Sequence, residues 1–217
     1  MKTRILVVDD HPLMRKGLAL TLSSEPDLEV VGQAADAEEA LRLFDQTTPD
    51  LVLVDVSLPG MNGLELVKHL VARQPDVKAL VVSRHDETLY AERAVRAGAK
   101  GYISKLEADE GIVDAVRHVL RGGIFMSEEL KDRLLFGAAI GRKEPMQSPL
   151  EVLSDRELEV FEMTGRGLPT REIAERLHLS VKTVESYRAR IKTKLNLETG
   201  TELMQHAVRW VEGERAG

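Results

Sequence analysis

The sequence contains no cysteine. Disulfides, thiolate metal sites and cysteine nucleophiles are therefore excluded, together with the class of small secreted proteins that disulfides stabilise. Apolar runs are also short. None approaches the roughly 20 residues that a membrane span requires, and the amino end MKTRILVVDD turns acidic where a signal peptide would continue apolar. These absences predict a chain that stays in the cytoplasm and makes no contact with a membrane.

Length and charge indicate more than one domain. A chain of 217 residues is long enough for two modest hydrophobic cores. The net charge of −6 is uneven, because residues 1–121 contain 15 Lys and Arg against 20 Asp and Glu, whereas residues 180–194 contain five basic residues and one acidic residue. An acidic half suits a cation or phosphoryl site. A basic stretch suits nucleic acid, although many such stretches are solvated helix faces.

Residues 4 to about 121 alternate short apolar runs with stretches of helical periodicity, a pattern typical of βα units around a parallel sheet. We predict strands at 5–8, 28–34, 51–54, 77–82 and 101–103. The second helix begins at Asp36, and Glu39 three residues later predicts a capping box. The fourth helix ends at Gly98, and the fifth ends before a Gly-Gly pair. Five strands and five helices predict a doubly wound α/β domain.

The second half of the chain has a different pattern. Residues 122–149 contain two glycines, a short predicted helix around 128–140 and the polar segment GRKEPMQSP, which we interpret as an exposed linker. Only helices are predicted after it, at 154–164, 170–177, 180–196 and 199–212, with Ser154 and Glu157 as a capping box. The predicted domains are therefore 1–121 and 150–217, joined by the linker 122–149.

Polar side chains follow the predicted strands of the first domain. Asp9 and Asp10 follow the first strand, Asp55 the third, Ser83 the fourth and Lys105 the fifth. In a doubly wound sheet these strand ends meet at one edge. Three carboxylates there would repel one another without a cation, and an all-oxygen ligand set suits Mg²⁺. Asp55 could then attack a phosphoryl donor, although taken singly a strand-end Asp is often a cap and a lone Lys is usually solvated.

The motifs VVDDHP, VDVSLPGMNG, VVSRH and GYISK resemble the receiver domain of bacterial two-component response regulators over roughly residues 1–121. The resemblance implies a sheet of flavodoxin-like order 2-1-3-4-5 and phosphorylation of Asp55 by a sensor histidine kinase. It implies that Mg²⁺ is bound by Asp10, Asp55 and the backbone carbonyl of Ser57, with Asp9 assisting through water.

The resemblance also assigns the residues that respond to the phosphoryl group. Lys105 would contact it, Ser83 would swing toward it, and Tyr102 would change rotamer and report the state on the surface of the fourth helix, fifth strand and fifth helix. A half-buried strand aromatic is the alternative for Tyr102. Many receivers follow the lysine with a cis proline, whereas Leu106 stands here, so we expect a trans bond and a somewhat different loop.

The segment TREIAERLHLSVKTVESYRARIKTKL predicts a helix-turn-helix, with a turn at His178-Leu179 and a second helix capped by Ser180. A helical projection gathers on its packed side Val181, Val184, Ile191 and Leu195. The opposite side contains Lys182, Ser186, Ala189, Arg190 and Thr193. Small residues at its centre suit close approach to a major groove, and flanking Lys182, Arg190, Lys192 and Lys194 could reach phosphates.

Residues 150–212 resemble the four-helix DNA-binding domain of the LuxR type, and its fusion to a receiver resembles the NarL/FixJ type of response regulator. The resemblance implies base contacts from Glu185, Ser186 and Ala189, with Lys182, Thr183 and Lys192 nearer the DNA backbone. Relatives often have Lys or Arg in place of Glu185 and His in place of Tyr187, which predicts a different operator. The last helix, with Leu203, Ala207 and Trp210, would form a homodimer contact, although Trp210 could equally close the core.

The predicted function is phosphorylation-controlled binding of an operator, and not enzymatic turnover. An aspartyl-phosphate hydrolase also uses a strand-end Asp with Mg²⁺, but it needs a second acid two residues later, where this chain has Ser57. A second alternative is that the helical domain binds a protein partner. DNA binding that is absent or independent of salt would support that alternative.

Overall fold

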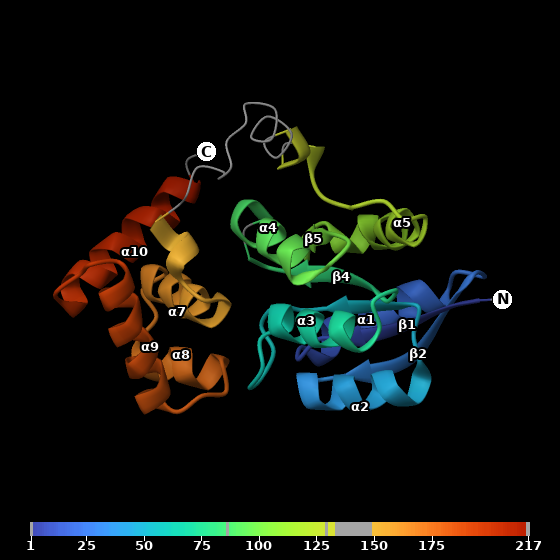
Figure 1. Cartoon of the computed structure of the whole chain (residues 1–217), viewed down its shortest axis with the longest axis horizontal. Coiled ribbons are helices and arrows are strands. Elements are labelled where there is room, and N and C mark those ends of the chain that lie inside the picture. The colour runs from blue at the N-terminus through green and yellow to red at the C-terminus, as the bar shows by residue number, and fades with distance from the viewer. Residues whose placement is uncertain (1, 86, 129, 133–148, 216–217) are drawn as a thin grey trace. The chain divides into compact units, whose positions relative to one another are not determined.

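The amino-terminal half alternates strands with helices, as its hydrophobic pattern predicts (Figure 1). The structure is a computed structural model that describes residues 2–85, 87–128, 130–132 and 149–215. The strands are β1 (Thr3–Val8), β2 (Leu28–Ala34), β3 (Leu51–Val54), β4 (Lys78–Ser83) and β5 (Tyr102–Ser104). The helices are α1 (Pro12–Ser23), α2 (Ala37–Thr47), α3 (Gly63–Arg73), α4 (Glu87–Ala97) and α5 (Ala108–Leu120).

The five strands form one parallel sheet in the order β2-β1-β3-β4-β5, which confirms the predicted fold. β4 and β5 each begin one residue later than predicted. This shift places Ser83 and Ser104 inside their strands, directly opposite each other in the β4–β5 register. The carboxyl ends of β1, β3, β4 and β5 therefore lie along the same edge of the sheet.

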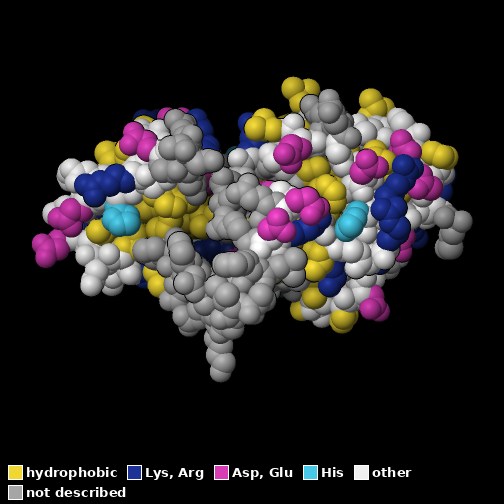
Figure 2. Space-filling view, turned by 90° about the horizontal axis from the view of Figure 1, so that it is seen from above, with side chains coloured by type: hydrophobic (Ala, Val, Ile, Leu, Met, Phe, Trp, Pro, Cys, Tyr) yellow, Lys and Arg dark blue, Asp and Glu magenta, His cyan; other side chains and the backbone are white. Residues whose placement is uncertain are grey.

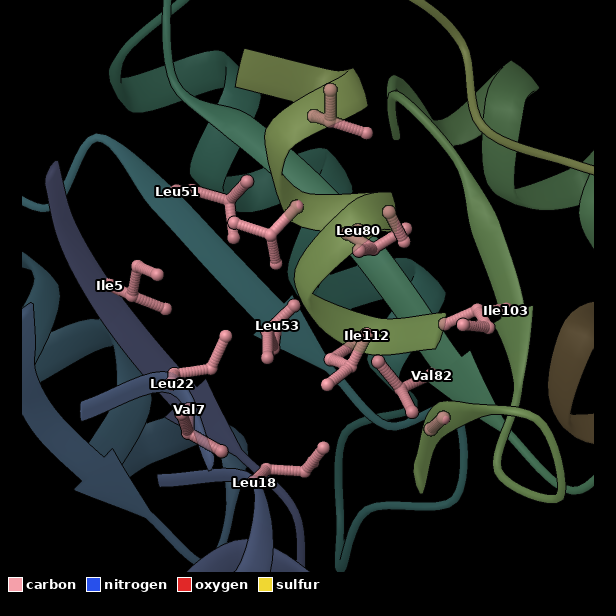
Figure 3. Packing of buried hydrophobic residues seen from close by; sticks show 14 of the residues in the cluster. Ile5, Val7, Leu18, Leu22, Leu51, Leu53, Leu80, Val82, Ile103 and Ile112 are labelled. Carbon is pink, nitrogen blue, oxygen red and sulfur yellow. The ribbon is translucent and has the colours of Figure 1, made fainter. Parts of the chain in front are cut away.

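The central strand β1 alternates its side chains between two apolar layers. Ile5 and Val7 of β1 pack with Leu53 of β3 and with α1 and α5, as Figure 3 shows, so Leu6 and Val8 face the opposite layer. Both layers are buried on β1, because parallel strands covered by helices on two faces have no solvated side. This double burial fixes the strand register and hence the positions of the residues that follow each strand.

Local caps set where the helices begin. Asp36 caps α2 as predicted by accepting a hydrogen bond from Glu39 N at 2.8 Å. The Glu39 carboxylate, however, accepts from Ala35 N at 2.9 Å and not from Asp36 N, so the bond that would complete a capping box is made one residue earlier. The prediction was therefore right about the cap and wrong about the reciprocal bond.

The chain beyond α5 returns to the edge of the sheet. Phe125 pairs with Gly101 beside β5, its N–H donating to Lys100 O at 3.0 Å and its carbonyl accepting from Tyr102 N at 2.8 Å. Ser127 N donates to Glu87 Oε1 at the start of α4, at 2.7 Å. The segment predicted as a linker therefore begins with residues that bind the β5 edge and α4. Of the helix predicted around 128–140, residues 128 and 130–132 are helical, and the remainder lies outside the described residues.

The carboxy-terminal unit is all helical, and its four predicted helices are confirmed. After the 3₁₀ turn Pro149–Val152 come α7 (Asp155–Gly165), α8 (Thr170–Arg176), α9 (Val181–Lys194) and α10 (Gly200–Arg215). The chain forms two compact units, Met1–Gly141 and Arg142–Gly217. Among the described residues, no helix combines the length and the apolar composition that crossing a membrane needs.

The capping box predicted at the start of α7 is present, and a lysine extends it. Ser154 Oγ accepts from Glu157 N, and Glu157 Oε2 accepts from Ser154 N at 2.7 Å and from Lys194 Nζ at 2.6 Å. Burial raises the pKa of Glu157, but its bonds with Lys194 and Ser154 outweigh burial and hold that pKa below 4.5. A single carboxylate thus joins the start of α7 to the end of α9.

We expect the helical unit to lose stability in acid through Glu157. Because the pKa of Glu157 is lowered in the folded chain, its stabilisation is fully present above about pH 4.5 and is lost as pH falls through the lowered value. Glu157→Gln should cost about 1 kcal/mol at pH 7 and flatten this part of the pH dependence. Urea unfolding followed by the fluorescence of Trp210, the only tryptophan, measures both effects. Glu172→Gln, in the exposed pair with Arg176, is the control and should change stability little.

Candidate functional site

Two carboxylates and a lysine meet at the carboxyl edge of the sheet, as predicted. Asp9 follows β1, Asp55 follows β3 and Lys105 follows β5, and all three are buried. Lys105 Nζ lies 2.7 Å from Asp9 Oδ2 and 2.7 Å from Asp55 Oδ2. The register of three parallel strands thus brings residues 50 positions apart in the sequence into direct contact.

Asp10 and His11 complete an acidic cluster beside Asp55. One ligand atom from each of Asp9, Asp10, His11 and Asp55 lies within 4.8 Å of the others. His11 Nδ1 is 2.5 Å from Asp10 Oδ1, and His11 N donates to Asp9 Oδ1 at 2.8 Å. The sequence analysis did not include His11 among the site residues, since a single histidine forms no metal-binding pattern. Its position directly after two aspartates was the signal that could have found it.

The cluster fits a divalent cation by charge and by donor type. Burial raises the pKa of Asp55 to about 6, and the Asp9 carboxylate adds to the rise while Lys105 and His85 oppose it. Three carboxylates against one lysine leave the cluster short of positive charge, and oxygen donors are those that Mg²⁺ prefers. The acidic residues present therefore suit Mg²⁺ binding at this edge.

Ser83 and Tyr102 are buried on the side of the cluster that faces α4. Ser83 is fully buried at the end of β4, and the Tyr102 hydroxyl donates to the backbone carbonyl of His85 at 2.6 Å. Tyr102 is thus an interior side chain and not the half-buried aromatic of the alternative interpretation. His85 also hydrogen-bonds Ser57, Nε2 to Oγ at 2.8 Å. Sequence analysis gave no role to His85, because a lone histidine in a loop forms no pattern.

The loop after Asp55 is held by close backbone packing. Gly63 N donates to Val56 O at 2.8 Å, and Asn62 caps α3 by accepting from Leu64 N at 2.8 Å. A Cβ atom on Gly63 would lie 1.8 Å from the carbonyl oxygen of Asp55. Only glycine fits at this contact.

The peptide bond between Lys105 and Leu106 is trans, as expected without a proline. Leu106 projects into solvent with 88% of its surface exposed, and its N–H donates to Ser104 Oγ at 3.3 Å. Lys105 thus reaches both aspartates with a trans bond after it, and Leu106 stands on the surface.

The predicted helix-turn-helix forms from α8, a turn and α9. His178 has a φ of 52° in the turn, and Ser180 caps α9 by accepting from Thr183 N at 3.0 Å. Val184 and Ile191 are fully buried, as the projection predicts. Val181, which the projection placed on the packed side, is exposed. It is the first residue of α9, and a helical projection takes no account of where a helix ends.

The residues predicted to meet DNA lie on the accessible side of α9. Five of the seven are exposed and two are partly exposed, the seven being Lys182, Thr183, Glu185, Ser186, Ala189, Arg190 and Lys192. The Arg190 guanidinium lies 5.9 Å from the centre of the Tyr187 ring, a contact the sequence analysis did not include. Lys194, predicted as a phosphate contact, forms an ion pair with Glu157.

Comparisons with known proteins agree with the geometry of the acidic cluster and of the helix-turn-helix. Residues 5–117 match the family model of the response regulator receiver domain, and residues 151–207 match that of the bacterial regulatory proteins of the LuxR family. The chain is a LuxR-type two-component response regulator. Proteins of this family regulate transcription.

Two curated relatives of this response regulator match nearly all of it, and a solved structure matches about two thirds. Response regulator GacA of Pseudomonas aeruginosa is 39% identical over 208 residues, covering 95% of each chain. Oxygen regulatory protein NreC of Staphylococcus carnosus is 37% identical over 210 residues, covering 95% of this chain and 97% of that protein. The crystal structure of a LuxR-family response regulator from an Aurantimonas species is 34% identical, with a TM-score of 0.59, over 64% of this chain and 99% of that one.

The burial of two residues on helix α10 of the DNA-binding domain corrects part of the predicted dimer contact. Leu203 and Ala207 are fully buried against the rest of the domain, so their side chains are not on the surface. Trp210 is partly exposed and packs on Phe161 with ring centres 5.8 Å apart. Hydrophobic side chains do gather on the surface of this domain in Figure 2, and Met204 of α10 is 41% exposed.

Proposed function

We propose that phosphorylation of Asp55 switches this response regulator and thereby controls sequence-specific binding of α9 to operator DNA. The observation that supports the proposal most is the buried Asp55 carboxylate, which lies 2.7 Å from Lys105 Nζ inside an acidic cluster. The Lys105 ammonium at this distance from a nucleophilic carboxylate suits both the formation and the retention of an acyl phosphate on Asp55.

The proposed reaction is transfer of a phosphoryl group from a phosphohistidine of a sensor kinase. A carboxylate oxygen of Asp55 forms a bond to phosphorus, the bond between phosphorus and the donor's imidazole nitrogen breaks, and that nitrogen leaves with the electron pair. Lys105 Nζ then offers its charge to a phosphoryl oxygen, and the Ser83 hydroxyl donates a second hydrogen bond. Tyr102 responds through the β4–α4 loop, in which the backbone carbonyl of His85 accepts a hydrogen bond from the Tyr102 hydroxyl.

The ligands we propose for Mg²⁺ are Asp10, Asp55 and the backbone carbonyl of Ser57, with Asp9 acting through water. When bound, the ion supplies the positive charge that offsets the carboxylates and the incoming phosphoryl oxygens. Ser57 stands where a phosphate-ester hydrolase needs its second acid, and a serine hydroxyl cannot protonate a leaving group as a carboxylic acid does. We therefore infer a switch without enzymatic turnover.

For the DNA-binding domain we propose that Ser186, Ala189 and Glu185 face the base edges. The carboxylate of Glu185 can accept from the amino group of cytosine, and the small Ser186 and Ala189 permit close approach. Lys182, Thr183, Arg190 and Lys192 are proposed to contact phosphates, which would fix the register of α9 in the groove. A phosphorylated homodimer would require two half-sites related by two-fold symmetry.

The test is selection of DNA from a random duplex pool by the full chain, with and without acetyl phosphate and Mg²⁺. We expect donor-dependent enrichment of a motif with two half-sites, and loss of that dependence in Asp55→Asn. Enrichment that is indifferent to the donor and to Asp55→Asn would keep DNA binding and reject phosphorylation control. No enrichment under any condition would favour a protein partner, and turnover of phosphate esters would favour an enzyme.

Ala189→Glu is expected to weaken binding to the selected DNA by about 100-fold, because it places a bulky carboxylate at the centre of the proposed contact face. Fluorescence anisotropy with the enriched duplex at fixed salt measures the change. Ala72→Glu makes the same substitution at an exposed position on α3 of the receiver domain and serves as the control. Equal affinities of the two variants would place the DNA contact elsewhere.

A further inference from the structure

His85 lies in the β4–α4 loop and is hydrogen-bonded to three other parts of the receiver site. Its imidazole Nε2 is 2.8 Å from Ser57 Oγ, in the loop two residues beyond Asp55. The backbone N–H of His85 donates to Ser83 Oγ at 3.3 Å, and the backbone carbonyl of His85 accepts from the Tyr102 hydroxyl at 2.6 Å. One residue is therefore bonded both to the loop beside the phosphoacceptor and to the two side chains proposed to respond to it.

The imidazole of His85 is also supported by α4. It stacks on the Tyr90 ring, with ring centres 4.3 Å apart and an angle of 21° between the ring planes. Tyr90 is fully buried, so this support is fixed by the packing of α4. A ring that is already held by stacking loses little further freedom when it bonds Ser57, which makes the bond more effective than one between mobile side chains.

We propose that His85 is a positioning residue that latches the resting form of the receiver through its hydrogen bond to Ser57. The inference rests on the proposed phosphorylation of Asp55. With the bond formed, the β4–α4 loop is fastened to the loop after β3, and Ser83 and Tyr102 keep their observed contacts with His85. A phosphoryl group that draws Ser83 Oγ away from the backbone N–H of His85 breaks one of these contacts and so favours movement of the loop that carries the other two.

The latch therefore opposes phosphorylation and keeps the active form scarce before a phosphoryl group arrives. A hydrogen bond of this kind biases a two-state equilibrium by about two- to tenfold. Removing either partner should raise the share of the active form by that factor. Because removing either partner abolishes the same Ser57–His85 bond, removing the second partner should add nothing through this bond.

The test is a double-mutant cycle on the full chain. His85→Phe keeps a ring to stack on Tyr90 but removes the nitrogen, and Ser57→Ala removes the hydroxyl while leaving the backbone carbonyl. The initial rate of phosphoryl uptake from acetyl phosphate with Mg²⁺ is followed by intact mass. We expect each single variant to react about two- to tenfold faster and the double variant to match the singles. His69→Phe, at an exposed position on α3, is the control for the same substitution elsewhere.

Amide hydrogen exchange of the peptide containing His85 provides a second measurement that needs no phosphorylation. In the unmodified chain, both single variants should exchange faster there than wild type, again without a further increase in the double variant. Unchanged exchange, slower uptake, or effects that multiply in the double variant would overturn the latch. If wild type takes up no phosphoryl group at all, the proposed function fails, and the exchange comparison still decides whether the latch exists.

Discussion

Gly63→Ala is expected to slow phosphoryl uptake at Asp55 by about 100-fold and to destabilise the receiver domain by about 3 kcal/mol. The added Cβ would lie 1.8 Å from the Asp55 carbonyl oxygen and 2.9 Å from Val56 Cα. Both contacts are with backbone, which cannot move aside as the end of a flexible side chain can. Either α3 or the end of β3 must shift, and each shift displaces the Asp55 carboxylate from Lys105.

The two effects are measured by intact mass after reaction with acetyl phosphate and by urea unfolding of the full chain. Gly17→Ala is a matched control, because a Cβ on Gly17 of α1 would meet nothing within 4 Å. That substitution should stabilise the chain by about 0.5–1 kcal/mol, since glycine in a helix interior is less favourable than alanine. If Gly63→Ala behaved like Gly17→Ala, the close packing beneath Asp55 would not be what fixes the phosphoacceptor.

Lys105→Met is expected to destabilise the chain by about 3–5 kcal/mol when Mg²⁺ is absent, because it leaves buried carboxylates without their cation. Lys105 is 7% exposed and contacts Asp9 and Asp55 together. The variant should also accept a phosphoryl group on Asp55 about 100-fold more slowly, because it lacks the positive charge of Lys105 beside the transferred group. Added Mg²⁺ should restore more stability to the variant than to wild type, since the ion replaces part of the missing positive charge.

Urea unfolding followed by far-ultraviolet circular dichroism, with Mg²⁺ or with a chelator, separates these contributions. Lys100→Met removes an exposed lysine one strand length away and is the matched control. It should leave both the stability and its dependence on Mg²⁺ unchanged. A variant at position 105 that resembled this control in both respects would mean that Lys105 neither balances the aspartates nor assists phosphorylation.

The convergence of Asp9, Asp55 and Lys105 could be predicted, because it follows from local patterns joined to a general rule. The strand order came from the resemblance to receiver domains. Runs of buried apolar residues identified the parallel strands, and such strands place their carboxyl ends at one edge. The phosphate-site residues needed only this edge and their positions after each strand. Caps were predicted almost as well, since Ser154 and Ser180 act within three residues of their own helices.

Contacts between distant segments could not be predicted in the same way. Nothing in the local sequence marks His85 as a partner of Ser57, or Phe125 as a partner of the β5 edge, because each contact depends on how two loops meet in space. Two of the three predicted dimer residues, Leu203 and Ala207, are buried, and the reason for this error is related. Leu203 and Ala207 share a helix face with apolar neighbours, and periodicity cannot distinguish a face buried inside the domain from a face that awaits another copy.

Pairing of Phe125 with the outer edge of β5 determines where the chain can be cut to give an intact receiver fragment. A fragment ending at residue 121 would lose the carbonyl that accepts Tyr102 N–H and the N–H that donates to the Lys100 carbonyl. Exposed edges of this kind invite strand addition from other molecules. Such a fragment would self-associate through its cut edge, and only fragments that extend past residue 130 would report the assembly of the intact receiver.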